Sequence, residues 1–151
     1  MFNLFKTSNV KKQIVTNKVA IDHLNKLLTT SMALGNQIIN MTEKDINCPL
    51  FMGEHEAKYH LFGRLMLFSK EVNSFFIHDK NVNYSFHYPS FTYYTVDEKV
   101  NTIRGYHEDK LSIITERIQS KMNEYITVNK KLERSISPLT KDQARKILTS
   151  K

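Results

Sequence analysis

The 151-residue sequence contains one cysteine, no tryptophan, three prolines and four glycines. Because Cys48 is the only cysteine, no disulfide can form within the chain, as is typical of proteins that fold in a reducing compartment. No apolar run at the N-terminus has the length of a signal peptide, and none elsewhere approaches the ~20 residues of a membrane-spanning helix. These absences predict a cytoplasmic protein with no transmembrane segment.

Several catalytic motifs are also missing. The glycines are isolated from one another, so they form neither common type of phosphate-binding loop, and there is no Gly-x-Ser-x-Gly elbow. In HEAKYH, His60 follows His55 by five positions, whereas the helical zinc site of metalloproteases needs a spacing of four. Helical ribonucleases of the HEPN type pair an arginine with a histidine at a wider spacing than that of Arg104 and His107. We therefore predict no enzymatic activity and no cofactor, and we interpret His107 as a core histidine with a hydrogen-bond partner.

The strongest pattern in the sequence is helical and extends from Val96 to Ile136. Thr95 precedes it and Glu98 follows three residues later, which is a capping box, and Pro138 marks the far end. Apolar residues recur at steps of three and four, interrupted only around Tyr106 and His107, which places them on one face of a helix. They are Val100, Ile103, Leu111, Ile114, Ile118, Met122, Tyr125, Val128, Leu132 and Ile136. We predict one long amphipathic helix onto which the other helices pack.

Three further helices are predicted from the same periodicity. The first begins after Thr7 or Ser8 and runs toward Met41. The second covers Glu54–Phe76, after a loop that contains turn-forming residues. A short basic helix is predicted within residues 137–151.

The segment from residue 77 to residue 95 has a different pattern. Aromatic and β-branched residues alternate with polar ones in its first half, which indicates a strand or an extended arm. A single strand must form a hairpin, lie across the helices or pair with another chain. Tyrosine and phenylalanine anchor interfaces, and Lys80 is the only lysine or arginine here and is offset by Asp79, which favours protein contact over nucleic-acid contact. The predicted binding surface consists of Tyr84, Phe86, Tyr88, Phe91, Tyr93 and Tyr94.

These patterns predict a mainly α fold, with a single domain over residues 1–151. Its architecture is an elongated bundle of three long helices and a short C-terminal helix, with an extended or β aromatic insert between the second and third. Helices of the predicted length measure roughly 50 to 60 Å at 1.5 Å per residue, unless Gly35 and Gly105 mark breaks. An elongated bundle leaves apolar surface that a second copy could cover, so we predict self-association, as in a homodimer.

The formal charge of +7 is concentrated at the two ends of the chain. Residues 1–27 carry a net charge of +4, residues 28–116 carry −3 and residues 117–151 carry +6. Basic ends favour an anionic partner such as nucleic acid, a lipid surface or an acidic protein, although they also serve solubility. The candidate contacts are Lys130, Lys131, Arg134, Lys141, Arg145 and Lys146.

A further pattern concerns zinc. The run IDHLNKLL around His23, followed by Cys48, His55 and His60, resembles bacterial chemoreceptor zinc-binding domains over residues 17–65. The resemblance implies a four-helix bundle in which these three histidines and the cysteine hold the metal. The sequence departs from that family because no Gly-Lys-Trp follows Cys48 and because the paired histidines are one residue too far apart.

Three functions are consistent with these observations. The first is a non-enzymatic cytoplasmic adaptor that acts through protein contact and associates with itself. The second is a nucleic-acid-binding accessory protein that uses the basic ends. The third is a zinc-responsive sensory bundle.

Overall fold

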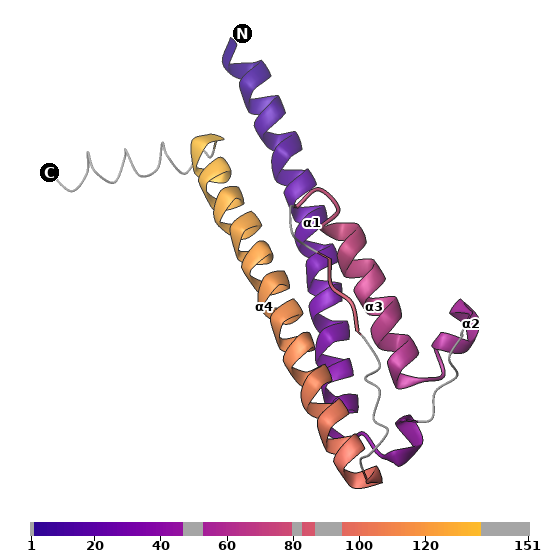
Figure 1. The fold of residues 1–151 in the computed structure, drawn as a ribbon. Coiled ribbons are helices and arrows are strands. Elements are labelled where there is room, and N and C mark those ends of the chain that lie inside the picture. Colours follow the sequence, from indigo (N-terminus) through magenta and orange to yellow (C-terminus); the bar gives the residue numbers. More distant parts are fainter. Residues whose placement is uncertain (1, 47–52, 80–82, 87–94, 137–151) are drawn as a thin grey trace, which may run out of the picture. The chain divides into compact units, whose positions relative to one another are not determined.

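A computed structural model describes residues 2–46, 53–79, 83–86 and 95–136. Four α-helices and one short 3₁₀ helix follow one another in these ranges (Figure 1). They are α1 (Phe2–Ile39), η1 (Glu43–Asp45), α2 (Glu54–Ala57), α3 (Leu61–Phe75) and α4 (Val96–Ile136). No strand occurs within the described ranges. The mainly helical fold is confirmed, and the predicted helix within residues 137–151 lies outside the described residues.

Helix α4 has the predicted bounds and the predicted N-terminal cap. The amide of Thr95 donates to Glu98 Oε2 at 3.0 Å, and the amide of Glu98 donates to Thr95 Oγ1 at 3.3 Å. The helix continues through Gly105 without interruption. Helix α1 likewise continues through Gly35 and starts five residues earlier than Thr7. Neither glycine breaks its helix.

The predicted helix Glu54–Phe76 is divided into α2 and α3, which is a correction to the sequence analysis. His60 has an extended backbone, with φ −124° and ψ 137°, and so separates the two helices. Gly63 packs against the backbone of Ala57, where an added Cβ would lie 2.4 Å from the Ala57 carbonyl oxygen. Arg64 Nη1 also donates to the Lys58 carbonyl at 3.0 Å. The break therefore depends on a close approach that only glycine permits.

The chain divides into two compact units. One unit contains Met1–Asn25 and Gln119–Lys151, and we call it the terminal unit. The other contains Lys26–Ile118, and we call it the central unit. Helices α1 and α4 each contribute residues to both units. The prediction of a single domain over residues 1–151 stays a prediction.

The core of the central unit is built from one buried stripe on each of its three longer helical segments. The two segments from α1 and α4 run antiparallel, because Ser31 hydrogen-bonds Thr115 while Gly35 faces Leu111. Helix α3 packs with them through its own buried stripe (Figure 1). The apolar core residues of the three helices are Leu27, Leu34, Ile38, Leu61, Leu65, Phe68, Val72, Val100, Ile103, Leu111, Ile114 and Ile118.

Residues 83–86 are anchored to the central unit by one asparagine. Asn73 Nδ2 donates to the Tyr84 carbonyl at 2.7 Å, and the Tyr84 amide donates to Asn73 Oδ1 at 2.8 Å. The two bonds satisfy the Tyr84 backbone as a neighbouring strand would. Phe86 is then buried, with an exposed fraction of 5%, and contacts His107 with ring centroids 5.6 Å apart. This segment has no regular secondary structure, and the rest of the predicted insert lies outside the described residues.

Candidate nucleic-acid interface

The positive net charge of the chain comes entirely from the terminal unit. Its sequence has twelve Lys or Arg residues and four Asp or Glu residues, a net charge of +8. The central unit has ten Lys or Arg residues and eleven Asp or Glu residues, a net charge of −1. The two basic ends of the chain therefore belong to one compact unit, which the charge pattern along the sequence does not show.

A buried asparagine pair holds together the two helical segments of the terminal unit. Asn17 Nδ2 donates to Asn129 Oδ1 at 2.8 Å, and Asn129 Nδ2 donates to the Ile14 carbonyl at 3.1 Å. Gln13 Nε2 donates to Asn17 Oδ1 at 2.8 Å and completes the network. Because a shift of either helix would leave these buried groups without partners, the pair fixes the register of α1 against α4 within this unit.

Replacement of Asn129 with alanine is expected to lower the free energy of unfolding by about 1–3 kcal/mol, since it leaves the buried Asn17 amide without its acceptor. The double variant Asn17→Leu/Asn129→Leu should recover part of that loss, because both partners are then apolar. Urea unfolding followed by circular dichroism measures both effects. The exposed Asn123→Ala on the same helix is the control and should change the free energy by less than about 0.5 kcal/mol. A control variant as unstable as Asn129→Ala would contradict this role.

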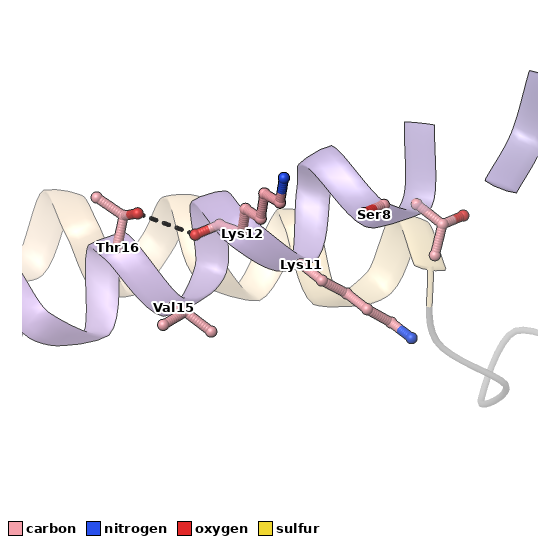
Figure 2. Close-up of a pocket in the computed structure, with 6 residues that line it drawn as sticks. Ser8, Lys11, Lys12, Val15 and Thr16 are labelled. Atoms are coloured by element: carbon pink, nitrogen blue, oxygen red, sulfur yellow. Dashed lines mark hydrogen bonds between the residues drawn. The ribbon is translucent and has the colours of Figure 1, made fainter. Parts of the chain in front are cut away.

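The α1 segment of the terminal unit presents a basic face with a surface groove of about 710 Å³ (Figure 2). Lys11 and Lys12 are both exposed and line this groove together with Val15 and hydroxyl-bearing side chains. Their ammonium groups extend in different directions from the helix, as Figure 2 shows. Thr16 Oγ1 donates to the Lys12 carbonyl at 3.0 Å, which turns that hydroxyl toward the backbone. The groove surface itself is mainly apolar, so the contribution of this face to anion binding comes from the two exposed ammonium groups at its rim.

The α4 segment of the terminal unit carries the described part of the predicted anionic-partner surface. Lys130, Lys131 and Arg134 are all exposed. Neither Lys130 nor Lys131 makes an ion pair with any residue that the structure describes, and the same holds for Lys11 and Lys12. The remaining predicted contacts, Lys141, Arg145 and Lys146, lie outside the described residues.

One ion pair links the two basic faces. Lys18 Nζ lies 3.9 Å from Glu133 Oε1, and both side chains are more than half exposed. Exposed pairs of this kind contribute little to stability because water and salt screen them. Glu133 nevertheless offsets part of the positive charge near Lys18, so the strongest unopposed charge belongs to the lysines named above.

The structure describes two residues of the predicted aromatic binding surface, Tyr84 and Phe86, and neither is fully exposed. Phe86 is a core residue of the central unit rather than an exposed anchor. Tyr84 is half-buried, and burial raises the pKa of its hydroxyl; Asp79 raises it further, while Arg117 partly offsets both effects. The other four members, Tyr88, Phe91, Tyr93 and Tyr94, lie outside the described residues. Their role in protein contact stays a prediction.

The predicted zinc ligands form no recognisable centre among the described residues. Within those ranges there is no group of three or more His, Cys, Asp or Glu side chains that could hold a metal ion. His23 and His55 are exposed, and His60 is half-buried at the start of α3. Cys48 lies outside the described residues, so a site that includes it stays a prediction.

His107 is a core residue, as predicted, with an exposed fraction of 1%. Burial lowers the pKa of its imidazole to about 4, so the ring is neutral at pH 7. The rings of Phe62, Phe86 and Tyr106 surround it at centroid distances of 5.4 to 6.0 Å. Its Nδ1 atom has no hydrogen-bond partner among the described residues, which differs from the predicted hydrogen-bonded histidine.

Arg104 lies one turn before His107 and joins the helix ends of the central unit. Its Nη2 atom donates to the Met41 carbonyl at 2.7 Å, and its Nη1 atom donates to Asn101 Oδ1 at 3.0 Å. Met41 follows the C-terminus of α1, where unpaired carbonyls and the helix dipole favour a cation. The buried Nε atom of Arg104 has no hydrogen-bond partner among the described residues. The two bonds of the guanidinium give Arg104 a structural role, and we assign no chemistry to it.

Comparison of the chain with protein-family models, with curated proteins and with solved structures found no match. Among the described residues, every helix is too short or too polar to serve as a candidate membrane span. The functional argument therefore depends on the charge, exposure and geometry of the residues themselves.

Proposed function

We propose that the terminal unit binds nucleic acid and that phosphate contacts from its exposed lysine and arginine side chains provide most of the affinity. The observation that carries this proposal is the separation of charge, +8 on the terminal unit against −1 on the central unit. Neutralising phosphates with lysine and arginine releases condensed counterions, and this release drives much of the binding of proteins to nucleic acids. The protein is then a binding module that acts through its basic terminal unit.

The exposed side chains of the terminal unit favour nucleic acid over a lipid surface. Helices that bind membrane surfaces insert large apolar side chains below the headgroups. Among residues 7–25 and 119–136, whose side chains the structure describes, the exposed large apolar residues are Val15, Val19 and Val128. These three valines offer little area for insertion, whereas the exposed lysines on the same stretches of both helices can contact phosphates directly.

The test is a variant that removes four unopposed charges, Lys11→Gln/Lys12→Gln/Lys130→Gln/Lys131→Gln. Binding of a short DNA duplex and of the corresponding single strand is measured by fluorescence anisotropy over a series of salt concentrations. We expect the variant to bind roughly 100-fold or more weakly at low salt, and we expect its salt dependence to be shallower by about 2–4 log units per log unit of salt. Each phosphate contact contributes about 0.9 to that slope on duplex DNA.

A matched control removes the same amount of charge from the central unit. Lys26, Lys44, Lys58 and Lys70 are all exposed there, and their replacement with glutamine gives the same net charge as the test variant. We expect this control to retain the salt dependence of binding of the unmodified protein. An equal loss of affinity in the two variants would mean that the total charge of the protein, and not the charge of the terminal unit, controls binding. Binding to phosphatidylserine vesicles without binding to either nucleic acid would also contradict the proposal.

A further inference from the structure

One sector of the exposed surface of α4 in the terminal unit is polar or basic, while the exposed Glu124, Val128 and Glu133 lie on other sides of the helix. At ~100° of rotation per residue, six residues of the segment 119–136 share a sector about 100° wide on the side opposite the buried Asn129. All six are exposed, and none is acidic or apolar. They are Ser120, Asn123, Thr127, Lys130, Lys131 and Arg134. Glu124 and Glu133 lie outside this sector.

The outward face of α1 in the same unit is mixed. Its exposed lysines share that face with Val15 and Val19, whose exposed fractions are 61% and 65%, and with Asp22 one turn further on. Apolar and acidic groups weaken a surface that must contact phosphates and base edges. The uninterrupted polar and basic sector of α4 is therefore better suited to lie against nucleic acid than the outward face of α1.

We infer that this face of α4 lies in the major groove of duplex DNA. The inference rests on the proposed function and names both the helix and the kind of nucleic acid. The row Asn123–Thr127–Lys130–Arg134 extends about 16 Å along the helix. An α-helix about 10–12 Å across fits the major groove of B-DNA, which is about 12 Å wide, whereas the deep and narrow major groove of duplex RNA does not admit one.

The side chains in this row divide into two roles. Asn123 and Thr127 are uncharged donors and acceptors of the kind that hydrogen-bond base edges. Lys130 and Arg134 lie one to three turns further along the helix and contact phosphates, which fix the position of the helix in the groove. A continuous helix that crosses the major groove is one of the established docking geometries of DNA-binding proteins.

The experiment compares the full-length protein with Asn123→Ala/Thr127→Ala on a DNA duplex and on an RNA duplex of the same sequence. We expect the unmodified protein to prefer the DNA duplex by about tenfold or more. The variant should bind that duplex about tenfold more weakly with an unchanged salt slope, because it removes base contacts and no charge. Thr102→Ala/Ser112→Ala, at exposed positions of α4 in the central unit, is the matched control and should bind like the unmodified protein.

The possible failures are distinguishable. If the DNA affinity of Asn123→Ala/Thr127→Ala equals that of the control while the four-lysine variant loses binding, the major-groove inference is wrong and the proposed function stands. Equal affinity of the unmodified protein for the two duplexes would also overturn the inference alone. If the unmodified protein binds neither duplex nor single-stranded DNA, both the inference and the proposed function are wrong.

Discussion

Replacing Phe86 with alanine is expected to lower the free energy of unfolding by about 3–5 kcal/mol. The ring is 5% exposed and lies against His107 in the central unit, so its removal leaves a cavity in addition to the lost burial of apolar surface. The cavity also gives water a path to the imidazole, which should move the pKa of His107 back toward 6.5. Phe86 is thus expected to act through stability, whereas the sequence pattern suggested that it binds a partner directly.

Chemical denaturation at neutral pH measures the change in stability, and NMR titration of the His107 ring measures the change in its pKa. Ile113→Ala is a suitable control, because Ile113 is 55% exposed on α4 and its truncation should cost no more than about 0.5 kcal/mol. A Phe86→Ala protein as stable as this control would show that the ring is not part of the core. If such a stable Phe86→Ala protein failed to bind a protein partner, the loss would be attributed to a direct contact between Phe86 and the partner rather than to unfolding.

Acidification from pH 6.5 to pH 4 is expected to remove about 3 kcal/mol of stability through His107 alone. The pKa of this imidazole is about 4 in the folded protein and 6.5 in the unfolded chain, so the unfolded chain takes up a proton at a higher pH than the folded protein does. The stabilisation is fully present above pH 6.5 and is lost as the pH falls toward 4. Each unit of difference in pKa corresponds to about 1.4 kcal/mol.

The contribution of His107 is isolated by comparing two variants over the same pH range. His107→Leu retains an apolar side chain of similar size and should be less sensitive to acid than the unmodified protein by about 3 kcal/mol. Ile113→Ala replaces an exposed side chain of the same helix, leaves every titratable group in place and should have the same pH dependence as the unmodified protein. Equal acid sensitivity of His107→Leu and Ile113→Ala would contradict the low pKa.

Helix α4 could be predicted from the sequence because every local signal agrees. Its apolar stripe continues for 41 residues, a capping box lies at its start, and a proline follows its end. The break between α2 and α3 could not be predicted in the same way, since Ala57 and Leu61 continue one helical stripe across it. That break depends on the contact of Gly63 with the Ala57 backbone, which only the folded chain contains.

Of the candidate site, the sequence predicts the exposure of the basic residues of α4 but not the burial of Phe86. Exposure of Lys130, Lys131 and Arg134 follows from their positions opposite the apolar stripe of α4. Burial of Phe86 does not follow from alternation, because a period of two separates two faces without saying which one is covered. The hydrogen bonds of Asn73 to Tyr84 hold this segment against the central unit, where Phe86 is buried. They join residues eleven positions apart, so the local pattern does not contain them.

The discontinuous composition of the terminal unit has a consequence for biosynthesis. Residues 26–118 leave the ribosome as one uninterrupted stretch, so the central unit has all of its residues before the last turns of α4 are translated. Asn129, the acceptor for Asn17 Nδ2, is synthesised 112 residues after Asn17, so the Nδ2 group lacks this partner until then. A released chain that ends at Ile118 should therefore contain a protease-resistant middle and a protease-sensitive beginning.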